Sequence, residues 1–316
     1  MKIRYSAPGK IILSGEHSVV YTKPALVTAV DLLLTVTVET GKLTELDNRV
    51  KEALGYCDGI VKTHLRKQNI KFKEEPYSFT VESTIPEGRG MGSSAAFCVA
   101  TAAALLHLYT GKPHDKETIN TLAYKCEHHF HGMPSGVDVS ASCFGGLIYY
   151  RREFEFLKYI SALNFKIPKN IQERLVLIDT GKPIESTSEM VKAVGKKYNT
   201  ETASMEQTLI GIEKITKRMV VSIVKEDLAL FRECIEENQK LLVDFGIVSK
   251  KTQNILEELS PYGVGKVTGA GGLTDGSGLV LFVMEDTEGF RKFSKDNNLR
   301  IVPFRQNFEG VKELTG

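Results

Sequence analysis

The chain has 316 residues, of which 42% are hydrophobic and 25% are charged, and its formal net charge is +2. This composition predicts a packed globular protein, with room for two domains or for one large domain with a deep cleft. The near balance of charge argues against a nucleic-acid partner, because nucleic-acid surfaces usually show a clustered basic face. The five cysteines are widely spaced, and the first residues do not resemble a signal peptide. We therefore expect reduced, mostly buried thiols, no membrane-spanning stretch and a cytoplasmic location.

Periodicity in the first half of the chain predicts a mixed α/β arrangement. The expected elements are strands over 1–6, 11–13 and 26–38, with a break at 7–10; a helix over 44–69 that breaks near Gly55; a strand over 77–83; a helix over 93–109; a second helix that Asp115 caps and that runs through His131; and a strand over 139–150 interrupted by Gly145-Gly146.

The second half is richer in helical periodicity. The expected elements are a strand over 175–180; helices over 186–195, 201–224, 225–244 and 249–259; strands over 264–268 and 278–284; a helix over 287–297; and a closing strand over 299–304. A mixed α/β half therefore precedes a helix-rich α+β half. We place the boundary near residue 165, which gives domains over 1–165 and 166–316.

Pro86–Ala96 is a glycine-rich segment, with Gly88, Gly90 and Gly92 placed just before Ser93-Ser94-Ala95-Ala96. Alternate glycines let the backbone adopt positive φ and approach a ligand closely. The serines begin a helix whose first N–H groups lack internal partners and whose dipole favours an anion. The segment has neither the G-K-[ST] ending of a Walker loop nor the G-x-G-x-x-G spacing. A phosphate cradle of another kind and a plain strand-to-helix turn both remain open on these residues alone.

Two carboxylates, Glu127 and Asp138, flank the compact turn 132–136. Such a turn can bring both to one cleft, where one holds Mg²⁺ and the other faces an acceptor hydroxyl, the division of labour that phosphoryl transfer needs. The histidines at 128, 129 and 131 lack the zincin spacing, so we expect them at the surface or behind the ligands rather than on zinc.

Two further segments carry polar or small residues. Lys10 follows the predicted strand break and precedes Glu16 and His17, so it is able to pair with Asp138 or to lower the pKa of a substrate hydroxyl. An exposed lysine beside a capped turn is the alternative. The segment 268–272, T-G-A-G-G, indicates close backbone approach to a ligand or loop, with a hairpin connection as the alternative.

Read together, four segments resemble the motifs of the superfamily of galactokinase, homoserine kinase, mevalonate kinase and phosphomevalonate kinase, the GHMP kinases. They are 7–20, 88–96, 127–138 and 268–272, and they span nearly the whole chain. The match is closest to the mevalonate kinases, because Gly15-Glu16-His17-Ser18-Val19-Val20 resembles their G-E-H-A-V-V. H-G-x-P-S-G-x-D over 131–138 is also typical of them.

The resemblance implies an α+β fold of two lobes, with an N-terminal ribosomal-protein-type βαβ lobe and a helix-rich, ferredoxin-like C-terminal lobe. It implies phosphorylation of the 5-hydroxyl of (R)-mevalonate by ATP and Mg²⁺, in a homodimer. By matching position, Asp138 would be the general base and Lys10 would stabilise the alkoxide. The other implied roles are acceptor contacts for Glu16, His17 and Thr187; ATP contacts for Gly88, Gly90, Met91, Gly92, Ser93, Ser94 and Ala95; and Mg²⁺ ligation for Ser94 and Glu127.

Leu273-Thr274-Asp275 departs from the family pattern, which usually continues G-A-G-G with more small residues before a strand. A partly acidic loop at this point puts the acceptor in doubt more than the kinase chemistry. The alternatives are a related kinase that acts on the 3-hydroxyl of mevalonate, on phosphomevalonate or on a sugar, and a non-catalytic nucleotide or metabolite sensor.

Overall fold

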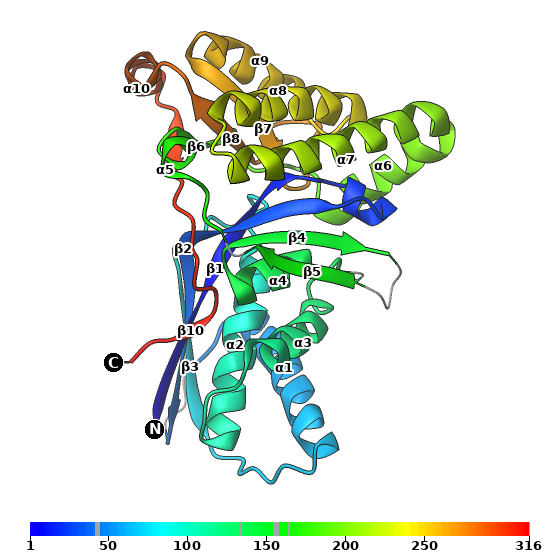
Figure 1. Cartoon of the computed structure of the whole chain (residues 1–316). Helices are drawn as coiled ribbons and strands as arrows, with labels where there is room; N and C mark the ends of the chain where they lie inside the picture. Colours follow the sequence, from blue (N-terminus) through cyan, green and yellow to red (C-terminus); the bar gives the residue numbers. More distant parts are fainter. Residues whose placement is uncertain (42–44, 133, 154–157, 164, 316) are drawn as a thin grey trace.

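The computed structural model describes residues 1–316 except 42–44, 133, 154–157, 164 and 316. The predicted start of the first helix at Thr44 and the predicted loop residue Met133 lie outside the described residues. Two separate sheets organise the chain, and Figure 1 shows each of them covered by its own group of helices. The expected α+β fold of two lobes is confirmed.

The first sheet has the order β10-β1-β2-β4-β5, and β3 also pairs with β2. Its pairings are antiparallel, and the helices of this lobe pack on it through α2 and α4. The strands are β1 (Lys2–Ser14), β2 (Ala25–Thr40), β3 (Tyr77–Ser83), β4 (Leu147–Arg152), β5 (Lys158–Leu163) and β10 (Lys312–Glu313), and the helices are α1 (Asn48–Lys67), α2 (Ser93–Thr110), α3 (Lys116–Glu127) and α4 (Val137–Phe144).

The second sheet has the antiparallel order β7-β8-β6-β9. All six residues of β8 are buried, so both faces of this sheet are covered: α8 packs against β7 and α7 against α8, and Phe290 of α10 stacks on Phe282 of β8. The elements are β6 (Leu175–Asp179), β7 (Gly263–Thr268), β8 (Leu279–Met284), β9 (Arg300–Pro303), α5 (Lys169–Gln172), α6 (Thr187–Thr200), α7 (Thr202–Val224), α8 (Leu228–Phe245), α9 (Lys250–Leu259) and α10 (Thr287–Asp296), with short 3₁₀ turns at Ser18–Tyr21 and Ser260–Tyr262.

The helix predicted to run through His131 ends earlier, at Glu127, and three other predicted elements were wrong. The strand break at 7–10 is instead a register shift between Pro8 and Gly9 inside the continuous strand β1. Gly55 does not interrupt α1, because the other residues of that helix carry its apolar face. The predicted strand over 139–150 is α4 followed by β4: nearly every α4 residue is buried, so this helix has no polar face to show a helical period.

Helix α2 is the core helix of the first lobe. Its 18 residues are long and apolar enough to cross a membrane by length and composition, so the expectation that no stretch meets this test was wrong. Of that segment, 72% is buried inside the protein, against β1, β2, α1, α3 and α4. A buried helix of a globular core passes the same test, and α2 has that position. The five cysteines are free and buried, as expected.

Candidate active site

The glycine-rich loop ends at the N-terminus of α2 in a conformation that glycine alone adopts without strain. Gly88, Gly90 and Gly92 have φ of +65°, +76° and +69°. The first helical bond runs from the Ala96 N–H to the Gly92 carbonyl at 2.9 Å, so the three preceding N–H groups have no partner within the helix. Because Gly92 has no side chain to cap them, these donors and the helix dipole are available to an anion.

Lys10 and Asp138 meet beside this N-terminus. Lys10 Nζ lies 3.1 Å from Asp138 Oδ1, so the predicted pairing is present. The backbone N–H of Lys10 donates to the Met91 carbonyl at 2.9 Å, which ties β1 to the loop. A Cβ at Gly92 would lie 3.1 Å from Lys10 Cγ and 3.8 Å from Asp138 Cβ. The loop, the cation and the carboxylate therefore form one site.

Gly92→Ala tests whether the loop needs this close approach. Positive φ costs an alanine about 1–2 kcal/mol, and the new Cβ would also push on the Lys10 side chain at 3.1 Å. We expect a lower unfolding free energy and a fall in kcat. Gly90→Ala is the matched control, because Gly90 also has positive φ (+76°) but its nearest neighbour would be 3.6 Å away. Equal losses of kcat in the two variants, measured with denaturation curves, would contradict crowding of Lys10.

The turn before α4 holds Asp138 in place. Gly136, with φ of +87°, is the residue that precedes α4, and Asp138 lies in the first helical turn. The Tyr150 hydroxyl donates to the Ser135 carbonyl, and the Tyr124 hydroxyl donates to the Pro134 carbonyl at 3.3 Å. Two tyrosines from β4 and α3 thus fix the turn that aims the carboxylate at Lys10.

Ser94 and Glu127 both contact His131. Ser94 Oγ is 3.2 Å from His131 Nε2, and the His131 backbone N–H donates to the Glu127 carbonyl at 3.0 Å. The Glu127 side chain is buried at the C-terminal end of α3. A hydroxyl and a carboxylate are the hard oxygen ligands that Mg²⁺ prefers, and Mg²⁺ commonly takes one or two protein ligands together with phosphate oxygens. These residues fit a magnesium ion that binds with a nucleotide.

The second glycine loop closes the site from the other lobe. Thr268 Oγ1 accepts from the Ile12 N–H at 2.9 Å and lies 3.0 Å from the Ile12 carbonyl. A Cβ at Gly90 would lie 3.6 Å from Gly269 Cα. The segment also begins the connection between the antiparallel strands β7 and β8. Both predictions for 268–272, close approach to another loop and a hairpin connection, therefore apply.

Glu16 is fully buried in an ion pair with Lys266 of β7, whose Nζ also donates to the Ile12 carbonyl at 3.2 Å. Burial raises the pKa of Glu16 and lowers the pKa of Lys266, against the attraction between the two charges. Glu16 Oε2 is buried and accepts no hydrogen bond from the described residues. This oxygen can therefore accept a hydrogen bond from a bound molecule.

His17 is held by the second glycine loop. Its Nε2 lies 2.9 Å from the Ala270 carbonyl, and a carbonyl can only accept, so Nε2 carries the hydrogen. Burial lowers the pKa of His17, which favours the neutral ring. In that form Nδ1 is a hydrogen-bond acceptor.

Thr187 is the exposed first residue of α6, which a capping box between Ser186 and Glu189 begins. Among the described residues, no hydrogen bond or ion pair joins Thr187 to Glu16, His17 or Asp138. The role of Thr187 in acceptor binding therefore stays a prediction.

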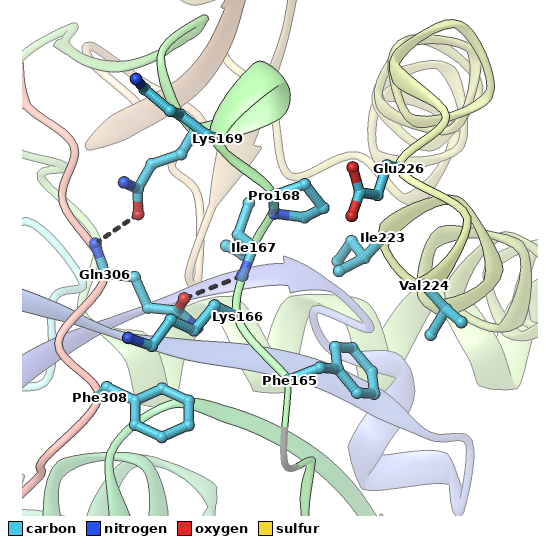
Figure 2. A pocket seen from close by; sticks show the side chains of 11 residues that line it. Phe165, Lys166, Ile167, Pro168, Lys169, Ile223, Val224, Glu226, Gln306 and Phe308 are labelled. Atoms are coloured by element: carbon cyan, nitrogen blue, oxygen red, sulfur yellow. Dashed lines mark hydrogen bonds between the residues drawn. The ribbon is translucent and has the colours of Figure 1, made fainter.

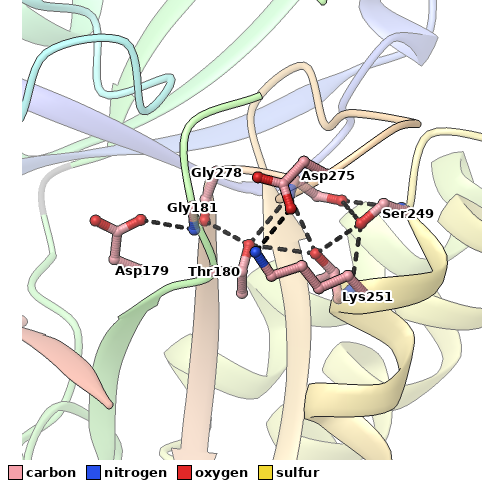
Figure 3. Close-up of polar contacts among 9 residues, drawn as sticks. Asp179, Thr180, Gly181, Ser249, Lys251, Asp275 and Gly278 are labelled. Atoms are coloured by element: carbon pink, nitrogen blue, oxygen red, sulfur yellow. Dashed lines mark hydrogen bonds and ion pairs between the residues drawn. The ribbon is translucent and has the colours of Figure 1, made fainter. Parts of the chain in front are cut away.

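The loop that departs from the family pattern is held by two side chains. Glu185 accepts from the backbone N–H groups of Leu273 and Thr274 at 3.1 and 3.0 Å. Lys251 Nζ lies 2.7 Å from Asp275 Oδ1, as Figure 3 shows. The acidic residue of this loop therefore pairs with α9 and not with the Lys10 cluster.

Sequence reasoning missed the partners that cross between segments. Lys266 could have been recognised as a residue with a buried partner, because it is the charged residue of an otherwise uncharged, mostly buried strand. Glu185 and the pair Arg89–Asp179, at 2.7 Å, have no comparable signal, because their partners are remote in the chain.

A pocket of about 630 Å³ lies away from this site, and Figure 2 shows its lining. Gln306 Oε1 accepts from the Ile167 N–H at 3.0 Å in its wall. It contains none of the predicted site residues, so we assign it no part in the chemistry. The lining residues are Phe165, Lys166, Ile167, Pro168, Lys169, Gln172, Ile223, Val224, Glu226, Gln306 and Phe308.

Comparison with known proteins shows which proteins this chain is similar to. Residues 49–146 match the GHMP kinases N terminal domain, and residues 219–274 match the GHMP kinases C terminal domain. A mevalonate kinase of Pyrococcus abyssi is 31% identical over 301 residues, covering 84% of this chain and 85% of that protein. One of Archaeoglobus fulgidus is 33% identical over 276 residues, covering 84% and 88%. The crystal structure of L. major mevalonate kinase in complex with R-mevalonate has a similar fold, with a TM-score of 0.76 at 20% identity and 95% of each chain covered.

Proposed function

Because the chain belongs to the mevalonate kinase family of the GHMP kinases, we propose that it transfers the terminal phosphoryl group of ATP to the 5-hydroxyl of (R)-mevalonate. The observation that carries the chemistry is the Lys10–Asp138 pair, at 3.1 Å, beside the open N-terminus of α2. The support for the acceptor is the similarity to mevalonate kinases over most of the chain.

In the proposed reaction, Asp138 accepts a hydrogen bond from the 5-hydroxyl and takes its proton as the oxygen bonds to the γ-phosphorus. The bond from that phosphorus to the β–γ bridging oxygen breaks, and ADP leaves. Lys10, only 3% exposed, stabilises the negative charge on the attacking oxygen. The N–H groups of Ser93, Ser94 and Ala95 and the loop 88–92 bind the phosphates.

Ser94 and Glu127 would hold Mg²⁺, which neutralises charge on the phosphates when it is bound. The support is a hydroxyl in the first turn of α2, 3.2 Å from His131 Nε2, and the buried Glu127, whose backbone carbonyl accepts from the His131 N–H at 3.0 Å. In this arrangement the protein supplies part of the ligand set and the nucleotide supplies the rest.

We propose Glu16, His17 and Thr187 as the acceptor contacts. Glu16 Oε2 is a buried oxygen that accepts no hydrogen bond from the described residues, and it is suited to accept from an acceptor hydroxyl. His17 Nδ1 is a second acceptor on the same segment. Thr187 lies at the start of α6, the helix that follows β6, and this residue would have to move toward the acceptor when the acceptor binds.

An acceptor screen tests this proposal. The protein is incubated with ATP, Mg²⁺ and, in turn, mevalonate, phosphomevalonate and galactose, and the product is mapped by phosphorus NMR. We expect turnover with (R)-mevalonate and a phosphate monoester on the primary 5-oxygen. Phosphate on the 3-oxygen, or turnover with another acceptor alone, would replace mevalonate 5-kinase with one of the related activities.

We further propose a cytoplasmic homodimer without nucleic-acid or membrane partners. The support is the near-balanced charge and the implied family assembly. Sedimentation of the purified protein tests the dimer, and a monomer at micromolar concentration would contradict it.

A further inference from the structure

Arg89 stands between two glycines of the phosphate loop, yet its side chain reaches the other lobe. Its Nε donates to Asp179 Oδ1 at 2.7 Å, and the two side chains are only 15% and 11% exposed. Asp179 is the last residue of β6 in the second sheet. The pair therefore joins the loop that precedes α2 to the sheet of the C-terminal lobe.

Hydrogen bonds of Asp179 and of the neighbouring Thr180 fix the position of the Asp179 carboxylate. Its Oδ1 also accepts from the Gly181 N–H at 2.9 Å. The neighbouring Thr180 donates from Oγ1 to the Gly278 carbonyl at 2.8 Å and accepts from the Ser277 N–H at 3.1 Å. Figure 3 shows this hydroxyl network on one side of the segment and the Asp179 carboxylate on the other. The carboxylate thus offers Arg89 a fixed position.

The backbones on either side of the pair are in contact. A Cβ at Gly278 would lie 3.4 Å from the Arg89 carbonyl, and one at Gly90 would lie 3.6 Å from Gly269 Cα. The loop therefore lies close against the second lobe, and the ion pair is a side-chain interaction that holds it there.

We propose that Arg89 and Asp179 are positioning residues, which hold the phosphate loop against the C-terminal lobe in its nucleotide-binding conformation. This inference rests on the proposed ATP site but not on the identity of the acceptor. A shielded, charge-assisted hydrogen bond from the loop to the fixed Asp179 carboxylate limits the orientations of the loop. Loss of this bond therefore raises the free-energy cost of ordering the loop around phosphates.

A double-mutant cycle tests the pair by calorimetric titration with ATP and Mg²⁺ in the absence of acceptor. Arg89→Met and Asp179→Asn should each weaken ATP binding by about tenfold, and the double variant should be little worse than either, because partners in one interaction are not additive. Asp179→Glu keeps the charge and should recover much of the affinity. In the kinetic assay, the KM for ATP should rise while the KM for the acceptor changes by less than about twofold.

Arg218→Met with Glu237→Gln is the matched control. That pair, at 2.6 Å, joins α7 to α8 within one lobe, so its loss should leave ATP affinity unchanged. Additive effects of the Arg89 and Asp179 changes, or lower melting temperatures with unchanged ATP affinity, would overturn the proposal. Because the titration contains no acceptor, failure of the acceptor screen would not affect it.

Discussion

Replacing Asp138 with asparagine is expected to lower kcat by about 10²–10⁴-fold, the range for loss of a positioned general base. The amide keeps the size of the side chain but cannot take the proton of the acceptor hydroxyl, and it leaves Lys10 without the carboxylate that lies 3.1 Å away. The N-terminus of α2 and its glycine loop are untouched by this change, so ATP affinity should stay within about threefold of the original value.

Steady-state kinetics and ATP titration of the same preparation separate the possible outcomes. Glu117→Gln is the control, because Glu117 is an exposed carboxylate in the first turn of α3, at the opposite end of that helix from Glu127. It should leave both kcat and ATP affinity unchanged. Turnover of Asp138→Asn within tenfold of the original would remove Asp138 from the proposed chemistry. An unaltered protein that binds ATP but phosphorylates no acceptor would be a sensor.

At the phosphate end of the site, the glycine loop and Asp138 lie at helix starts that glycines mark, whereas Lys10 lies inside the strand β1. Gly92 precedes α2 and Gly136 precedes α4, both with positive φ, and such glycines mark where a helix begins. Asp138 follows from the second of these starts. Local signals indicate the two helix starts and a possible pairing of Lys10 with Asp138, and the resemblance to the GHMP kinases brings these features together in one predicted site.

What the sequence could not show is how the lobes meet. Arg89 lies between two glycines of the loop, and its partner Asp179 is 90 residues away. Nothing in the periodicity of β6 indicates which loop its last residue faces. Helix α4 was mistaken for a strand for a related reason, because tertiary burial on all sides removes the polar face that distinguishes the two periods.

Lys266→Met is expected to have the largest effect on stability, with a loss of about 3–5 kcal/mol in the free energy of unfolding, because it leaves the Glu16 carboxylate buried without its cation. Both side chains are fully buried in the folded protein. The second change, Glu16→Gln in the same chain, should recover much of that loss, since it removes the uncompensated charge. Lys240→Met is the surface control: Lys240 and Glu236 pair at 2.9 Å with side chains 68% and 41% exposed, and such a loss costs less than about 1 kcal/mol.

The loss in Lys266→Met should depend on pH, and the direction follows from Glu16. Burial already raises the pKa of Glu16 above its usual value of 4.5, and removal of Lys266 takes away the main interaction that lowers it. The folded state of the variant then binds a proton that the unfolded state releases, so its stability falls as pH rises from about 4.5 through the raised pKa. Urea denaturation between pH 4.5 and 7.5 should show the deficit growing with pH in Lys266→Met and remaining flat after Glu16→Gln is added. A deficit that is the same at both ends of this range, or no larger than that of Lys240→Met, would contradict a buried, charged Glu16–Lys266 pair.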